Sequence, residues 1–197
     1  MEDYDIDELI EQLEYDEDRE ATIAALVEIG EPAVPDLIAA LENVIWDVCD
    51  GAADALARIG APAVSALIDT FAHEFRHVAL NASDAVARIG EPAVPALVEA
   101  LNDTYDPVRE YAVRALSTIA LSTQTVVPAL IRALGDDEVD IRTYAAVGLA
   151  NVGEAASDAV PALIATLTDE SDRVREHVAF ALSEIGTPEA EKALSEL

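Results

Sequence analysis

Two histidines four residues apart are the most suggestive catalytic residues in the chain. The segment His73-Glu74-Phe75-Arg76-His77 spells the H-E-x-x-H pattern. On a helix, side chains at positions i and i+4 share a face, so both imidazoles could bind one Zn²⁺ while the glutamate acts as general base. The pattern raises a zinc-dependent hydrolase as an alternative function, with His73 and His77 as metal ligands.

The surroundings of this pattern argue against zinc chemistry. The H-x-x-G-x-x-H continuation is missing, and the third histidine, His177, lies three repeats away. A third ligand would have to be Asp84 or Glu91. Residues 73–77 also correspond to residues 103–107 one repeat later, where a turn between helices is expected. We therefore expect an inter-helix turn here, with no metal site, no catalytic residue and no cofactor.

An internal repeat of about thirty residues organises the whole chain. Gly90–Ala120 reads as a helix, a turn and a second helix, and the approximate units are 1–30, 31–60, 61–90, 91–120, 121–153 and 154–186, with a terminal helix at 187–197. Glycine ends the second helices, and Pro32, Pro62 and Pro92 open the next unit. The pattern predicts an all-α fold, an α-α superhelix of about six helix pairs plus a C-terminal capping helix, in one domain spanning residues 1–197.

Charge is the most extreme property of the composition. Forty acidic residues face eleven basic ones, giving a net charge of −29. Self-repulsion of this size destabilises a compact chain, and at about 1 M salt the Debye length falls to about 3 Å. The composition resembles that of proteins from salt-accumulating cells, so we expect salt ions to be required for stability. The rival explanation is an acidic surface that serves a basic partner.

Other features of the sequence bound the location and the chemistry. Cys49 is the single cysteine, which leaves no intramolecular disulfide and no thiolate metal cluster. No apolar run reaches the roughly 18 residues of a membrane span, and the acidic N-terminus lacks the features of a signal peptide. We therefore expect a cytoplasmic protein with no membrane partner.

Several consecutive units carry the same consensus residues. These are Asp106-Pro107-Val108-Arg109, Asp140-Ile141-Arg142 and Asp172-Arg173-Val174-Arg175, each followed by an Ala-Leu-rich helix. At these residues the chain resembles HEAT-like repeats of the short kind named after phycobilisome lyases. The resemblance is specific for the fold and weak for the function, because this fold hosts scaffolds, lyases, hydroxylases and DNA glycosylases.

The resemblance implies that the second helices line a concave face that binds partners. Carrying the register over places eight candidate protein-binding residues on it: Trp46, Arg58, Arg88, Tyr111, Arg114, Tyr144, His177 and Phe180. Tyr111, Tyr144 and His177 would form a ladder beside a line of arginines, suited to a peptide or helix with acidic and apolar side chains. The alternative is that Tyr111 and Tyr144 only pack between helices.

The repeated arginines have a structural interpretation under the same resemblance. In such repeats this arginine usually pairs with an acidic turn residue of its own or the neighbouring unit. For Arg109, Arg142 and Arg175 the candidate partners are Asp103, Asp136 and Asp169.

Enzymatic and nucleic-acid functions fit the sequence less well. A di-iron hydroxylase needs several His-Glu pairs on the second helices, and a bilin lyase would have only Cys49 as a thiol. A net charge of −29 opposes phosphate binding, so no nucleic-acid partner is expected. We therefore predict a non-catalytic scaffold or adaptor that binds a protein partner in its concave groove. A subunit or regulator that docks on a larger assembly by its edges is a further alternative.

Overall fold

The computed structural model describes residues 5–15 and 19–197, which divide into two compact units. Unit 1 is Met1–Ala96 and unit 2 is Leu97–Leu197. Within the described residues the structure is helical and contains no strand. The fold class is the α-α superhelix that the sequence predicts.

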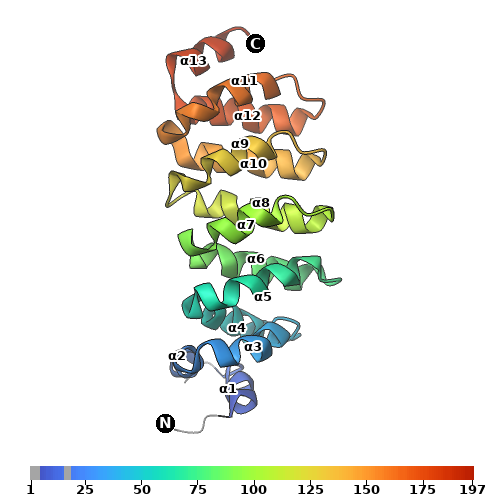
Figure 1. Cartoon of the computed structure of the whole chain (residues 1–197), viewed down its shortest axis with the longest axis vertical. Coiled ribbons are helices and arrows are strands. Elements are labelled where there is room, and N and C mark those ends of the chain that lie inside the picture. The colour runs from blue at the N-terminus through green and yellow to red at the C-terminus, as the bar shows by residue number, and fades with distance from the viewer. Residues whose placement is uncertain (1–4, 16–18) are drawn as a thin grey trace. The chain divides into compact units, whose positions relative to one another are not determined.

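Unit 1 is a stack of helix pairs (Figure 1). Its elements are α1 (Ile6–Gln12), α2 (Arg19–Ile29), η1 (Glu31–Ala33), α3 (Val34–Ala40), α4 (Trp46–Ile59), η2 (Ala61–Ala63), α5 (Val64–Asp69), η3 (Thr70–Ala72), α6 (Arg76–Ile89) and η4 (Glu91–Ala93). Helix α7 (Val94–Ala100) begins in this unit and ends in the next. The second helix α4 packs between α2 and α6.

Unit 2 repeats the same arrangement. It holds α8 (Asp106–Ile119), η5 (Gln124–Val126), α9 (Val127–Ala133), α10 (Val139–Val152), η6 (Gly153–Ala159), α11 (Val160–Thr166), α12 (Asp172–Ile185) and α13 (Pro188–Ser195). The second helix α10 packs between α8 and α12, and the last helix, α13, packs on α11 and α12.

Glycine and proline set the repeat boundaries for a physical reason. After every second helix except α8, the next residue is a glycine with positive φ, between 61° and 80°, at positions 30, 60, 90, 153 and 186. Only glycine adopts this backbone without strain. After α8 the equivalent residue is Ala120, with φ −54°, and the chain needs three more residues before η5 begins at Gln124. Pro32, Pro62 and Pro92 lie in short 3-10 turns just before each first helix.

Small side chains allow the second helices to approach closely. Fully buried alanines recur on one face of each long helix, as at Ala52, Ala82, Ala112 and Ala145. At Gly148 of α10 an added Cβ would lie 2.7 Å from Leu130 Cδ1 and 3.0 Å from Ser117 Cα. Leucine fills the space between the first and second helices. This core therefore depends on tight helix contacts.

The described helices are short compared with a membrane span. No single helix there has the length and apolar character that crossing a bilayer requires, although Trp46–Ile59 and Ala61–Ala72 meet the criterion jointly, across a bend of 117°.

Candidate protein-binding surface

A part-buried ladder of arginines and aspartates joins consecutive repeats of unit 2. Arg109 donates from Nε and Nη2 to the two carboxylate oxygens of Asp136, at 2.9 and 3.1 Å. Arg142 binds Asp169 in the same way, at 2.8 and 3.0 Å. The predicted pairing with a turn aspartate is confirmed for both arginines, and of the two expected alternatives the partner is that of the neighbouring unit. Bidentate pairs of this kind fix how the second helix of one repeat is aligned with the hairpin turn of the next repeat.

Each ladder arginine also binds its own repeat. Arg109 donates to the Asp103 carbonyl at 3.0 Å, Arg142 to the Asp136 carbonyl at 2.8 Å and Arg175 to the Asp169 carbonyl at 2.6 Å. Arg175 also pairs with Asp172 on its own helix. The ladder therefore ties the hairpin turn to the start of the second helix, and that helix is presented in a defined orientation.

The ladder shifts the titration of its carboxylates. Burial raises the pKa of Asp136, but the hydrogen bonds from Arg109 and from the Glu138 N–H outweigh burial and hold it below its ordinary value. The Arg142 hydrogen bond is the main cause of a lowered pKa at Asp169, where it outweighs burial. Both aspartates are therefore held in the charged form in the folded state.

The H-E-x-x-H segment lies at a hairpin turn, as predicted. His73 follows η3, and α6 begins only at Arg76, so His73 and His77 do not share a helical face. The Phe75 N–H donates to His73 Nδ1 at 3.1 Å, while His73 Nε2 lies 3.3 Å from Glu42 Oε1. Both imidazole nitrogens of His73 thus have a protein partner, one in its own turn and one in the preceding turn.

The same turn geometry recurs in every hairpin turn from the second repeat to the sixth. One side chain accepts the N–H two residues later at Asn43, His73, Asp103, Asp136 and Asp169. His73 therefore occupies the position of a turn-forming Asp or Asn. The Phe75 ring lies near both imidazoles, with centroids 5.5 Å from His73 and 6.0 Å from His77. Among residues 5–15 and 19–197, no group of three His, Cys, Asp or Glu side chains is arranged to hold a metal ion.

The lone thiol is packed rather than reactive. Cys49 is 5% exposed, and its Sγ donates to the Trp46 carbonyl at 3.1 Å. Burial raises the pKa of the Cys49 thiol, which disfavours the thiolate needed for nucleophilic chemistry.

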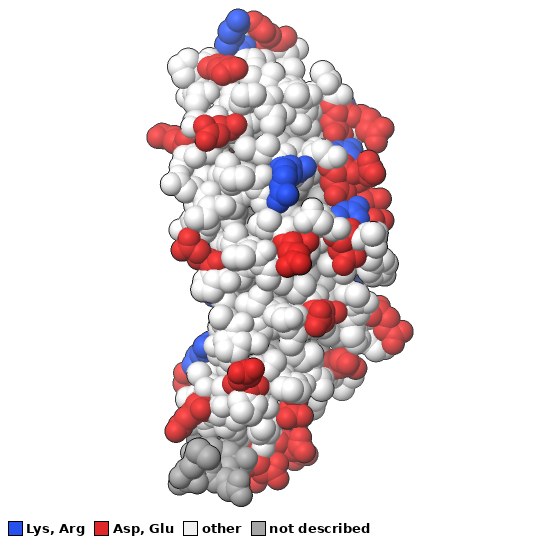
Figure 2. Space-filling model, viewed as in Figure 1, with Lys and Arg blue, Asp and Glu red and all other residues white. Residues whose placement is uncertain are grey.

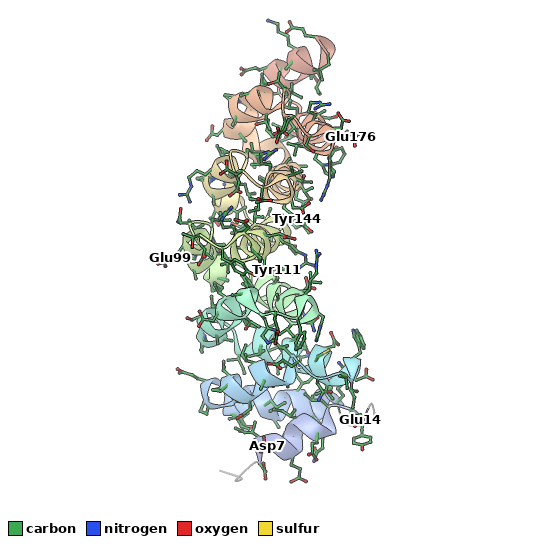
Figure 3. The ribbon with its side chains drawn as sticks, turned by 90° about the vertical axis from the view of Figure 1, so that its right-hand side faces the viewer. Asp7, Glu14, Glu99, Tyr111, Tyr144 and Glu176 are labelled. Atoms are coloured by element: carbon green, nitrogen blue, oxygen red, sulfur yellow. The ribbon has the colours of Figure 1, made fainter. Side chains whose placement is uncertain are left out.

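The predicted aromatic ladder is only partly presented to solvent. Tyr111 is 6% exposed and belongs to the buried stripe of α8, which corrects the expectation that its ring faces a partner. Its spacing from Val108 and Ala112 is that of a core position, so for Tyr111 the packing alternative fits. Tyr144 and His177, at the same register in α10 and α12, are half-buried. Figure 3 labels Tyr111 and Tyr144, which lie on the second helices α8 and α10.

A shallow pocket, open to solvent, lies between the second helices α10 and α12. It is lined mainly by apolar atoms of five side chains: Val147, Asn151, Glu176, His177 and Phe180. Phe180 is 57% exposed. The Asn151 amide donates to the Ser117 carbonyl of α8 at 2.8 Å, and His177 Nδ1 lies 2.8 Å from the Arg173 carbonyl. We call these five residues together with Tyr144 the second-helix face of unit 2.

The predicted arginine line is neutralised by carboxylates in unit 1. Arg58 donates to both oxygens of Glu20, at 2.6 and 2.9 Å, and pairs with Asp54 at 2.8 Å. Arg88 binds Asp54 at 2.7 Å. These pairs join α2 to α4 and α4 to α6, so the charges expected to attract acidic side chains already have carboxylate partners within the chain. Arg114 lies about one helical turn nearer to the start of α8 than Arg58 and Arg88 lie to the starts of α4 and α6.

Trp46 is exposed, but it does not lie on the second-helix face of unit 2. It is the first residue of α4 and is 68% exposed, at the hairpin turn. Other large apolar residues are exposed at the turns of unit 1, namely Tyr15, Val44 and Phe75, and the register argument missed them. The sequence signal for two of them is an apolar residue close after a turn-forming residue, Val44 after Asn43 and Phe75 two residues after His73.

The comparisons with known proteins agree with this geometry. The HEAT repeats family matches residues 64–150 and 127–197, and the PBS lyase HEAT-like repeat matches residues 18–43. No curated protein sequence matches the chain significantly.

Solved structures with a similar fold include natural and designed repeat proteins. The complex of CpcE and CpcF of phycocyanin lyase from Nostoc is 26% identical, covering 68% of this chain and 85% of that chain with a TM-score of 0.60. A designed armadillo repeat protein in complex with peptide (KR)4 is 19% identical, covering 93% and 100% with a TM-score of 0.52. A Kap121p mutant is 16% identical, covering 97% of this chain and 27% of that chain with a TM-score of 0.65. The chain therefore belongs to the HEAT repeat family.

Proposed function

We propose that this chain is a non-catalytic scaffold that binds a segment of a partner protein on the second-helix face of unit 2. The observation that carries the proposal is the exposed Phe180 beside an apolar pocket on stacked, rigidly registered helices. Aromatic side chains in such positions contribute a large share of binding energy in protein interfaces. The arginine ladder preorganises the face, which lowers the entropic cost of binding.

The charge of the chain favours a basic partner segment. Arg58 and Arg88 are already paired, whereas the pocket between α10 and α12 has the carboxylate of Glu176 at its edge. A large apolar side chain would contact Phe180 and Val147, and a neighbouring lysine or arginine would approach Glu176. The designed armadillo protein with this fold was solved with a basic peptide, which supports the same chemistry for this chain.

A second candidate function follows from the lyase structure. CpcE and CpcF are two chains solved as one complex, and their likeness to this chain supports a role as a subunit paired with another protein. This role also needs no catalytic residue here, and the arrangement of His73 opposes the zinc hydrolase alternative.

Peptide display against the immobilised protein tests the proposal. The selection is expected to enrich peptides in which a large apolar residue is flanked by Lys or Arg. Phe180→Ala should weaken the selected peptide by about tenfold or more, because it removes the exposed anchor. Leu121→Ala is the matched control, since Leu121 is also exposed, at 71%, but lies in the loop before η5. Enrichment of acidic peptides, or equal losses in both variants, would contradict the proposal.

A further inference from the structure

The hairpin turns of unit 1 expose an unusual set of large apolar side chains. Tyr15 follows α1 and is 64% exposed, Val44 is 98% exposed and Trp46 is 68% exposed. Phe75, at the next turn, is 49% exposed. We call these four residues the turn-edge patch. Large apolar residues gathered on one edge typically mark an interaction site.

The local backbone makes this exposure a built feature of the turns. The Asn43 side chain accepts the Ile45 N–H at 2.9 Å, and His73 Nδ1 accepts the Phe75 N–H at 3.1 Å. Each turn is closed by its own hydrogen bond, so the neighbouring apolar residue projects outward. The contact of His73 Nε2 with Glu42, at 3.3 Å, joins the second and third turns.

A pocket with an acidic rim adjoins the turn-edge patch. It is lined by residues of α1 and the turn that follows it, and by residues of the turn before α4 and the first turn of α4: Glu8, Ile10, Glu11, Gln12, Glu14, Tyr15, Asn43, Ile45 and Val48. Its apolar atoms come from Ile10, Ile45, Val48 and the Tyr15 ring. Glu8 and Glu11 are exposed on α1 and Glu14 is exposed just after it, and no basic residue lines the pocket. Figure 3 looks onto this side of the molecule and labels Glu14.

The turns of the last two repeats differ in chemistry. The residues that correspond to Ile45 and Phe75 are Glu138 and Ser171, although Tyr105 keeps the aromatic character in the first turn of unit 2. The carboxylates of those two turns are paired with the ladder arginines. Acidic and basic atoms are mixed along this margin of unit 2 in Figure 2. An apolar patch beside carboxylates that lack arginine partners is therefore specific to unit 1 among the described residues.

We infer that the turn-edge patch is a second docking surface, which binds an amphipathic basic helix of a partner protein. Apolar residues on one face of that helix would contact Trp46, Val44 and Tyr15. Lysines or arginines on its flank would face Glu8, Glu11 and Glu14. Charge complementarity favours a basic helix, because the three carboxylates would repel an acidic helix or an anionic lipid surface.

Trp46 provides a direct test, because it is the only tryptophan in the chain. The probe is a synthetic amphipathic peptide with leucines on one face and lysines on the other, added to the full chain in constant salt. Its binding should move the Trp46 emission to shorter wavelength as water leaves the indole. The same peptide with glutamates in place of the lysines should leave the emission unchanged.

Two matched sets of substitutions separate a local site from general attraction by the net charge. Glu8→Gln, Glu11→Gln and Glu14→Gln together should weaken the lysine peptide by about tenfold. Glu99→Gln, Glu154→Gln and Asp158→Asn change the net charge equally at exposed positions of unit 2 and should leave the affinity within about twofold. Circular dichroism of each variant verifies that its helices are intact.

The outcomes also distinguish this site from the second-helix face. Phe180→Ala should leave the change in Trp46 emission intact, so this surface can stand even where the proposed function fails. Equal weakening by the two sets of carboxylate substitutions would overturn the inference. So would binding of the peptide, measured by its own anisotropy, without any change in Trp46 emission.

Discussion

The arginines of the second helices form two kinds of ion pair, which differ in how much of the paired side chains is exposed to solvent. In the Arg142–Asp169 pair the side chains are 8% and 10% exposed, whereas in the Arg173–Asp140 pair both are 51% exposed. Arg142 also satisfies two carbonyls of its own turn. Loss of Arg142 therefore leaves a buried carboxylate and two carbonyls without their donor, which is costly.

Arg142→Ala is expected to lower the free energy of unfolding by about 3 kcal/mol, because it breaks a buried ion pair. Arg173→Ala is the matched control and should cost at most about 1 kcal/mol, as an exposed pair does. Urea denaturation followed by circular dichroism measures both values. Similar losses in the two variants would contradict the structural role of the ladder.

Acid should weaken the ladder. The folded-state pKa of Asp169 lies below its ordinary value of 3.8, because Arg142 stabilises the carboxylate. A lowered pKa contributes stability that is present above the ordinary value and is lost as the pH falls through the folded-state value. The urea midpoint should therefore fall between about pH 6 and about pH 3 by more in the wild type than in a variant carrying both Arg142→Met and Asp169→Asn. An equal fall in both proteins would count against this assignment.

His73 should behave as a turn residue and not as a metal ligand. His73→Asn places the residue of the preceding turn, Asn43, at this position and should change the free energy of unfolding by less than about 0.5 kcal/mol. His73→Ala removes the acceptor of the Phe75 N–H and should cost about 1 kcal/mol. Isothermal calorimetry with Zn²⁺ should give no binding heat in any of the three proteins. Zinc binding that disappears in His73→Ala would restore the hydrolase alternative.

At the scale of the element, glycine is required where three helices meet. A Cβ at Gly148 would lie 2.7 Å from Leu130 Cδ1, whereas one at Gly135 would meet only the Arg132 carbonyl, at 3.6 Å. Gly148→Ala should therefore lower the free energy of unfolding by about 1–3 kcal/mol through overpacking. Gly135→Ala serves as the control and should be tolerated. Equal melting temperatures for the two variants would show that α8, α9 and α10 are not packed as described.

The helix pairs could be predicted from the sequence because their determinants are local. Gly60 and Gly90 end helices through a backbone conformation that their own residue type permits, and the following prolines mark the next start. Pairing of Arg109 with Asp136 was also predictable, because both lie at fixed positions of the repeat. Where Ala120 stands in place of glycine, the loop before the next repeat is longer.

The binding surface was harder to predict because burial depth depends on neighbouring helices. Tyr111 and Tyr144 occupy the same register, but only Tyr144 is partly exposed. Arg58 and Arg88 were expected to attract acidic ligands. Each of them instead forms an ion pair with a carboxylate on a neighbouring helix, Arg58 with Glu20 and Arg88 with Asp54. Apart from Trp46, the exposed apolar residues at the turns of unit 1 were not predicted, because only residues of the second helices were expected to bind a partner.

At the scale of the whole chain, the net charge of −29 should make the fold depend on salt. Most carboxylates are exposed, and their mutual repulsion acts over about 10 Å at 0.1 M salt but only about 3 Å at 1 M salt. The melting temperature should therefore rise steadily as NaCl is raised from about 0.05 M to about 2 M. NaCl is preferred to sulfate, since sulfate also strengthens apolar burial. An unchanged melting curve over this range would contradict the salt requirement.

Photocrosslinking of a bound peptide is the most direct test of the second-helix face as a binding site. A photoreactive phenylalanine analogue replaces Phe180 in one variant and Leu121 in another, both at exposed positions of unit 2. Each variant is irradiated with the basic and apolar peptide obtained by display. The account predicts a crosslink from position 180 and none from position 121. A crosslink from position 121 alone, or none from position 180 while the peptide remains bound, would contradict it.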